Sequence, residues 1–336
     1  MKSFLREGPG GGDPWPPPPN TNSIHNRIAA IDIGSLTVRL AVAEVVEPGR
    51  FQVLVHRREI TGLGREVAET GQLSPADQNR TIESLKGFAQ EMAALRVVRG
   101  QGVATQAVRQ AKNGKEFLRA AEKVLNLPVR LLTPEEEAHL ALSGVLSALD
   151  PKYRDAGPLM VFDVGGGSSE FILVRRDRAP VFAGLPLGVL SLSRTRPLGD
   201  PPRPEKVADL KEELSRKLQN FYQEHFRGLL EGSPTLVGTA GSVTTLAALA
   251  QEMTAYDPKK VNNYQLTRAK VAELAQRLAA LPEKERSRLP GIEPAKAGVM
   301  VAGALIVQTI LEVFGQERLV AVDAGLLEGV LANLAR

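Results

Sequence analysis

The sequence predicts an α/β fold of two similar halves that face each other across a cleft. Residues 29–35 and 160–166 both run from an apolar strand through an aspartate into a glycine turn, and another strand follows each turn. The second turn contains three successive glycines, where a plain hairpin needs one or two. A length of 336 residues is comfortable for two domains.

Composition narrows the class of protein. The formal net charge is +4 and the basic residues form no long runs, so a nucleic-acid surface is not expected. No cysteine is present, which excludes disulfides, thiolate catalysis and cysteine-ligated zinc. No apolar stretch reaches the length of a membrane span, and a cytoplasmic protein is expected.

Residues 1–26 are rich in proline and glycine and predict a disordered or polyproline-like tail. They lack the continuous apolar core of a signal peptide. The folded part is therefore expected to begin at Arg27.

The first half predicts an antiparallel meander over residues 28–33, 37–43 and 51–60. Ser74 and Pro75 predict the start of a helix, as its N-cap and its first helical position. Apolar residues then recur at three- and four-residue spacing, as on the buried face of a helix. A short strand at 102–104, a helix at 117–125, a strand at 129–132 and a further helix from Pro134 complete this half.

Three successive glutamates lie at the start of that last helix, and the pattern predicts a different role for each. Thr133 and Glu136 form a capping box, so Glu136 has a structural role. Glu135 lies in the first turn, where the helix dipole favours an acid. The cap does not need Glu137, which therefore requires another explanation.

The second half opens with the hairpin 160–174, followed by a strand end and turn at 184–189. A surface connection at 196–204 leads to a charged amphipathic helix at 205–226 with a solvated outer face. The remaining elements are a strand at 235–237, helices at 243–250, 262–281 and 298–314, a strand at 319–322 and a closing helix at 326–334.

The triple-glycine turn is expected to bind a phosphate group in the cleft between the two halves, which makes it a phosphate-binding cleft. Glycines let backbone N–H groups converge on a phosphate oxygen without an intervening side chain. Asp163 and Glu170 flank the turn, where a divalent cation bound to phosphate would need hard oxygen ligands. The alternative is that these carboxylates merely cap the turn.

These segments resemble the exopolyphosphatase / guanosine pentaphosphate phosphohydrolase (Ppx/GppA) family of the sugar kinase, heat-shock-70 and actin superfamily. The resemblance runs from about Arg27 onward and rests on six motifs in the right order, at residues 32–35, 105–113, 136–138, 163–170, 238–242 and 325–329. It implies two ribonuclease H-like (actin-like ATPase) domains, one of residues 27–132 plus 323–336 and one of residues 133–322. The sequence resembles the short form, without the C-terminal HD-like domain of longer members.

The resemblance also implies roles for individual residues. Glu137 corresponds to the catalytic glutamate, as general base or water orienter, against the alternative of a surface acid. Asp163, assisted by Asp32 and Glu170, is expected to hold Mg²⁺ or Mn²⁺. Arg109 is expected to contact phosphate, with a structural salt bridge as the alternative. The other expected phosphate-binding residues are Gly34, Ser35, Gly165, Gly166, Gly167, Ser168, Gly241 and Ser242.

Five positions depart from the family pattern. Leu36 stands where the family has Asn, Gly62 and His139 where it has Arg, Gly298 where Asp is common, and Leu327 where Arg is frequent. The carboxylates and glycine loops are retained while several substrate-side polar residues are replaced. Hydrolysis is therefore better supported than the identity of the substrate.

The expected function is Mg²⁺-dependent removal of terminal phosphate from inorganic polyphosphate or guanosine pentaphosphate, the latter yielding the tetraphosphate of the stringent response. One alternative is an ATP-dependent kinase or ATPase of the same superfamily. Another is a non-catalytic sensor that binds polyphosphate or an alarmone. No nucleic-acid or membrane partner is expected, and the oligomeric state is left open, with a homodimer as one alternative.

Overall fold

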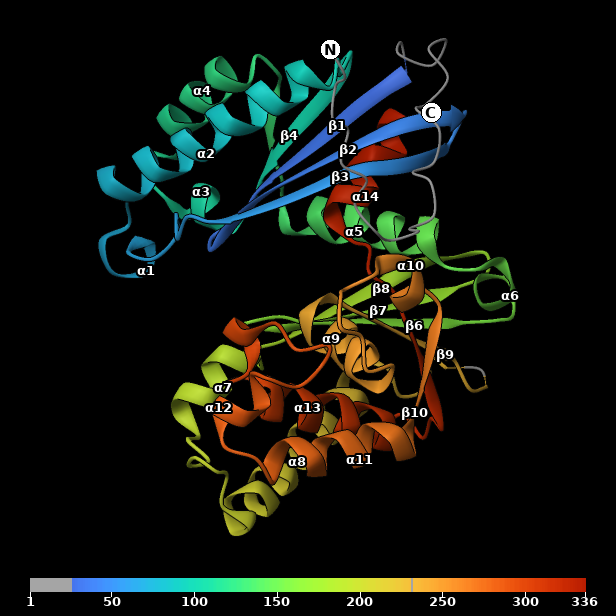
Figure 1. Cartoon of the computed structure of the whole chain (residues 1–336). Coiled ribbons are helices and arrows are strands. Elements are labelled where there is room, and N and C mark those ends of the chain that lie inside the picture. Colours follow the sequence, from blue (N-terminus) through green and yellow to red (C-terminus); the bar gives the residue numbers. More distant parts are fainter. Residues whose placement is uncertain (1–25, 231) are drawn as a thin grey trace, which may run out of the picture.

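The computed structural model describes residues 26–230 and 232–336 and shows two lobes, each built on a mixed β-sheet (Figure 1). The first sheet has the order β3-β2-β1-β4-β5 and the second β10-β11-β9-β6-β7-β8. The strands of the first sheet are β1 (Arg27–Ile33), β2 (Thr37–Glu47), β3 (Arg50–Ile60), β4 (Arg99–Ala104) and β5 (Val129–Leu131). Those of the second are β6 (Leu159–Val164), β7 (Ser169–Arg175), β8 (Arg178–Leu185), β9 (Thr235–Thr239), β10 (Tyr264–Thr267) and β11 (Arg318–Ala321).

The two sheets repeat one topology. In the first, β1 and β3 are antiparallel to β2, while β1, β4 and β5 are parallel. In the second, β6 and β8 are antiparallel to β7, while β6, β9 and β11 are parallel. The strand β10 is an antiparallel addition at the edge. This duplication confirms the expected pair of ribonuclease H-like domains.

Helices cover both faces of the first sheet. On one face lie α1 (Val67–Thr70), α2 (Pro75–Ala94), α3 (Gln106–Gln110) and α4 (Gly114–Leu125). The predicted cap of α2 is confirmed, since the Ser74 side chain accepts a hydrogen bond from the Asp77 N–H. On the other face α14 (Leu326–Leu334) packs against Ile28 and Ala30 of β1. The central strand β1 is thus buried on both sides, which explains its nearly continuous apolar sequence.

The layer between the lobes consists of α14 and α5 (Pro134–Ala148), here called the helix pair (Figure 1). Apolar residues of α5, including Leu142 and Val145, pack on the second sheet. The two helices meet at glycines: a Cβ on Gly144 would lie 1.9 Å from the Gly325 carbonyl oxygen, and one on Gly329 would lie 1.9 Å from that of Leu140. The backbones therefore touch directly. The division of the chain at residue 132 stays a prediction.

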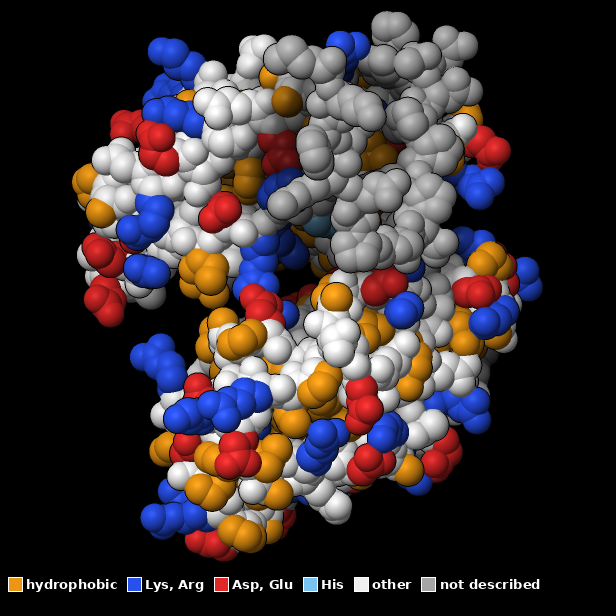
Figure 2. Space-filling view, in the orientation of Figure 1, with side chains coloured by type: hydrophobic (Ala, Val, Ile, Leu, Met, Phe, Trp, Pro, Cys, Tyr) orange, Lys and Arg blue, Asp and Glu red, His pale blue; other side chains and the backbone are white. Residues whose placement is uncertain are grey.

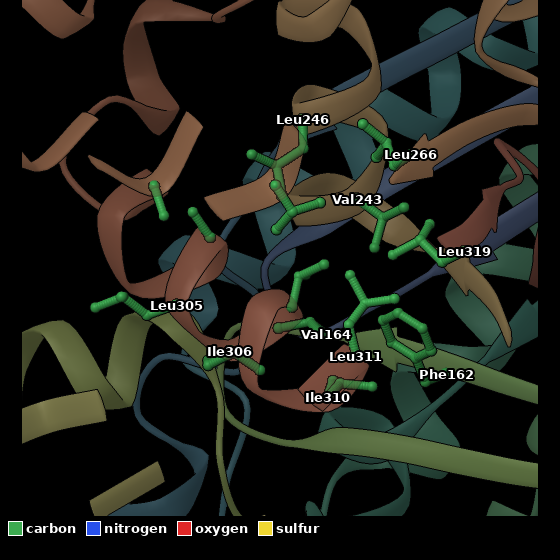
Figure 3. Close-up of a cluster of buried hydrophobic side chains, with 14 of the residues drawn as sticks. Phe162, Val164, Val243, Leu246, Leu266, Leu305, Ile306, Ile310, Leu311 and Leu319 are labelled. Atoms are coloured by element: carbon green, nitrogen blue, oxygen red, sulfur yellow. The ribbon is translucent and has the colours of Figure 1, made fainter. Parts of the chain in front are cut away.

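The larger core lies on the far side of the second sheet, under α8 (Pro204–His225), α9 (Ala240–Ala250), α11 (Arg268–Ala279) and α13 (Met300–Val313). Figure 3 shows Phe162 and Val164 of β6 among Leu311, Ile310 and Leu246 of these helices. The charged helix α8 is amphipathic as predicted, and it buries one leucine-rich face. Among the described residues no helix is both long and apolar enough to cross a membrane.

The predicted helix over 262–281 is wrong at its beginning. Residues 264–267 alternate as β10 and pair with β11, and α11 starts only at Arg268, where the Thr267 side chain accepts a hydrogen bond from the Lys270 N–H. Strand β8 was predicted only at its end. Six short helices were not predicted, namely α1, α3, α6 (Pro151–Arg154), α7 (Val189–Thr195), α10 (Pro258–Val261) and α12 (Glu283–Arg286). The predicted tail, up to residue 25, lies outside the described residues.

Candidate active site

Strand alternation directs both aspartates toward the helix pair. Phe162 and Val164 face the large core, so Asp163 between them faces the opposite side of the sheet. In β1, Ile31 and Ile33 pack with α2 and α4, so Asp32 faces the side covered by α14. The two aspartates therefore face the space between the lobes from opposite walls.

The loops behind the two aspartates have the same geometry. The Gly34 N–H donates to the Thr37 carbonyl at 3.0 Å, and the Gly165 N–H donates to the Ser168 carbonyl at 2.9 Å. A Cβ on either glycine would lie 3.0 Å from that same carbonyl oxygen. The N–H groups of Gly34 and Gly165 thus close the turns. Within the described residues, the N–H groups of Ser35, Gly166, Gly167 and Ser168 have no protein acceptor and are left for a ligand.

Helix α7, which was not predicted, fixes the triple-glycine loop. The N–H groups of Val189 and Leu190 donate to the Gly165 and Gly166 carbonyls at 3.0 and 2.9 Å. A Cβ on Gly188 would lie 2.4 Å from backbone atoms of this loop. The loop is held from behind, and its free N–H groups keep a fixed direction.

Glu137 is the glutamate left over by the helix cap, as predicted from the sequence. Glu136 completes the capping box, with its carboxylate accepting the Thr133 N–H at 2.9 Å. The Glu137 carboxylate instead lies 3.6 Å from an Arg109 guanidinium nitrogen. Burial raises the pKa of Glu137, and the charges of Asp32 and Glu170 raise it further, while Arg109 opposes the shift. Carboxylates from both walls thus act electrostatically on Glu137.

Arg109 has two contacts. One guanidinium nitrogen donates to the Leu132 carbonyl at 2.5 Å and also forms the ion pair with Glu137. The salt-bridge alternative raised from the sequence is therefore what this structure shows. The same contacts hold the guanidinium beside the Glu137 carboxylate.

Arg39 is a site residue that sequence reasoning missed. It lies directly opposite Asp32 on β2 and donates from Nε at 2.9 Å and Nη2 at 2.5 Å to one carboxylate oxygen. The charge of Asp32 raises the pKa of Arg39, with smaller contributions from Glu328 and Asp163. Asp32 and Arg39 lie at equal distances from the turn of the predicted hairpin, and this spacing could have revealed that they are cross-strand partners.

The carboxylates fit a magnesium ion. Asp163 and Glu170 are cross-strand neighbours, and the second oxygen of Asp32 is buried with no partner among the described residues. No three acidic or histidine side chains in the described ranges form a complete metal site by themselves. Mg²⁺ commonly binds through one or two carboxylates and completes its shell with water and phosphate, so this donor set suits it.

The pKa of Asp163 leads to a prediction about stability. Burial and the neighbouring charge of Glu170 raise it to about 7, against the partial opposition of Arg39. The unfolded value is about 3.9. Folded protein therefore holds this proton more tightly, and the associated stability is complete below about pH 4 and lost as the pH rises to about 7. Asp163→Asn is expected to raise the melting temperature of metal-free protein at pH 8.

Thermal unfolding in a metal chelator checks this expectation. The same variant should leave the melting temperature nearly unchanged at pH 4, where the Asp163 carboxyl of the folded wild type is protonated and uncharged. Asp177→Asn, in the exposed β7–β8 turn, is the matched control. Equal melting temperatures of wild type and Asp163→Asn at pH 8 would show that the Asp163 charge is not destabilising.

The loop after β9 lines the second wall. Gly241 lies beside Lys296, whose Nζ would be 3.9 Å from a Cβ at that position. The Ser242 side chain is 5% exposed, and its hydroxyl lies against Gly303 of α13. Its contribution to a phosphate is therefore limited to the N–H in the first turn of α9, where unsatisfied donors favour an anion.

The departures from the family pattern fall in different places. Leu36 is 47% exposed on the first loop, and its carbonyl accepts the N–H of Gly62, which has a φ of +66° that a side chain rarely adopts. His139 is two residues from Glu137 and thus on nearly the opposite face of α5, with its ring 4.6 Å from that of Phe182. Leu327 is buried and Gly298 lies against Glu283. Only Leu36 and Gly62 adjoin a phosphate loop.

Two ribonuclease H-like domains with facing Asp–Gly loops define a phosphate-binding protein of the sugar kinase, heat-shock-70 and actin superfamily. Within it, the chain belongs to the Ppx/GppA phosphatase family, whose model matches residues 41–336.

Relatives and solved structures agree with this placement. Exopolyphosphatase 2 of Mycobacterium tuberculosis is 30% identical over 321 residues, covering 92% of this chain and 98% of the relative. A putative exopolyphosphatase of Haemophilus influenzae is 27% identical, with 92% and 91% covered. The crystal structure of the Aquifex aeolicus Ppx/GppA phosphatase, type II variant, is 36% identical with a TM-score of 0.80, over 92% and 99% of the two chains.

Proposed function

We propose that this protein is a Mg²⁺-dependent hydrolase that removes terminal phosphate from inorganic polyphosphate or guanosine pentaphosphate. The observation that carries the proposal is the position of Glu137. It is free of the helix cap, it lies 3.6 Å from the Arg109 guanidinium, and burial together with the charges of Asp32 and Glu170 raises its pKa. The names of the relatives, two of which are exopolyphosphatases, support polyphosphate as the substrate class.

The residues divide the reaction as follows. The free N–H groups of the two loops bind the oxygens of the terminal phosphate, and Glu137 orients a water molecule and accepts its proton as the new P–O bond forms. The phosphoanhydride bond breaks, and the shortened chain leaves with the electron pair. Arg109 keeps Glu137 in place, and Arg39 does the same for Asp32.

Asp163 would hold the magnesium ion directly or through water, and Glu170 and the unpaired oxygen of Asp32 would assist. When bound, Mg²⁺ would neutralise negative charge on the phosphoryl oxygens.

Phosphate release from polyphosphate of several lengths, guanosine pentaphosphate and ATP tests the proposal. We expect release in the presence of Mg²⁺ or Mn²⁺ and none in a chelator. ADP release that depends on an added acceptor would instead identify a kinase. Tight binding of polyphosphate or guanosine pentaphosphate without turnover would identify a sensor.

A further inference from the structure

One ion-pair cluster joins the two lobes away from the helix pair. Arg58 of β3 places a guanidinium nitrogen 3.6 Å from a Glu293 carboxylate oxygen, and the Lys296 ammonium lies 2.9 Å from the same oxygen. Glu293 directly precedes the short 3₁₀ helix η2 (Pro294–Lys296) of the second lobe. The hydrogen bond from Lys296 lowers the pKa of Glu293, and the charge of Arg58 lowers it further.

Within the described ranges, this cluster contains the one ion pair that joins the two lobes without involving the helix pair. Among the ion pairs of residues 26–230 and 232–336, Arg58–Glu293 alone connects residues 26–132 with residues 149–325. The other pairs that leave the first lobe end on the helix pair, namely Arg109–Glu137, Arg130–Glu136 and His56–Glu328. The lobes are therefore joined ionically at the helix pair and at Glu293.

The cluster also lies in line with the phosphate site. Asp32, Arg39 and Arg58 are directly opposite one another on β1, β2 and β3, so their side chains share the face that looks toward α14. On the other lobe, Lys296 lies beside Gly241, in the loop after β9. A row of cationic groups thus runs from Asp32 outward to the second lobe. In Figure 2, basic and acidic side chains gather where the lobes approach each other beside an open gap.

The bonds within the cluster are readily exchangeable. The Arg58 and Glu293 side chains are 42% and 48% exposed, and an exposed ion pair is worth little. A condensed phosphate carries a negative charge on every unit and can replace a single carboxylate on two cations. Such an exchange keeps the cations paired and leaves Glu293 to the solvent.

We propose that Arg58, Glu293 and Lys296 form an ionic latch across the cleft, in which Glu293 occupies the cationic site that a substrate phosphate beyond the cleaved one takes on binding. This inference rests on the proposed function. Glu293 competes with substrate and holds the empty lobes together. The bound phosphate chain then bridges Arg58 and Lys296 in place of the carboxylate.

Steady-state kinetics test the competition. Glu293→Gln is expected to lower KM for long polyphosphate about two- to five-fold at unchanged kcat, and Arg58→Gln to raise it by a similar factor. Glu273→Gln, which removes an exposed acid paired with Lys270 on α11, is the control and should change neither constant. Both effects should diminish at high salt. An effect seen with guanosine pentaphosphate but not with polyphosphate would overturn the assignment to a linear chain.

A distance measurement tests the bridge without relying on catalysis. The chain has no cysteine, so spin labels can be attached at Gln90→Cys on α2 and Gln223→Cys on α8, both exposed. Glu293→Gln should broaden the interlobe distance distribution of the empty protein, and added polyphosphate should narrow it again. Glu273→Gln should match the wild type.

The two proposals fail in different ways. If the wild type neither binds nor cleaves polyphosphate or guanosine pentaphosphate, the proposed function is wrong. If it cleaves them while Glu293→Gln behaves like Glu273→Gln in both KM and distance distribution, the latch alone is wrong.

Discussion

Glu137→Gln is expected to lower kcat for phosphate release by about 10²–10⁴-fold, the usual contribution of a positioned general base. Glutamine keeps the shape and the contact distance to Arg109 but cannot accept a proton from water. The phosphate loops and the carboxylates of Asp32 and Asp163 are untouched, so substrate binding should persist. Rates of phosphate release under saturating polyphosphate and Mg²⁺, with binding measured separately by calorimetry, check the two halves of this expectation.

The same helix turn supplies the control. Glu135 is exposed and forms no ion pair among the described residues, so Glu135→Gln removes an identical charge two residues away and should retain full activity. Full activity of Glu137→Gln would contradict the mechanism. A loss of binding equal to the loss of rate would make Glu137 a substrate-binding residue instead.

Gly329→Ala is expected to reduce the free energy of unfolding by about 3 kcal/mol, at the upper end of the usual cost of overpacking. The added methyl group would lie 1.9 Å from the Leu140 carbonyl oxygen, so the helix pair would have to separate along its length. Backbone cannot rotate away as a flexible side chain can. Urea denaturation followed by circular dichroism measures the change.

Gly87→Ala is the matched control for a helical glycine. It lies in α2 with no atom within 4 Å of the added Cβ. Alanine there should stabilise by about 0.5–1 kcal/mol, because glycine loses more backbone freedom on folding. If Gly329→Ala behaved like Gly87→Ala, the helices of the pair could not be in backbone contact.

Local patterns carried most of the fold and the core of the site. The repeated Asp–Gly turns predicted two similar lobes because the repeat reports the same strand–turn–strand geometry twice. That the helix cap does not use Glu137 followed from elimination within one helix turn, where Glu136 was already part of the capping box. Each of these patterns lies within a segment only a few residues long.

What could not be predicted depends on contacts distant in sequence. The strand β10 was taken for helix because its pairing partner β11 is more than fifty residues away. Helix α7 was missed because its support of the Gly165–Gly167 loop comes from tertiary contact. Arg58 and Glu293 lie 235 positions apart, and no local signal links them.

The position of α14 has a consequence for co-translational folding. The inner face of β1 needs Leu327, Val330 and Leu331 to cover it, yet those residues are synthesised nearly 300 positions later. The first sheet must therefore remain with Ile28 and Val103 uncovered until α14 has been synthesised. The first lobe can thus close only after the second lobe has been synthesised, and its apolar face stays exposed in the interval.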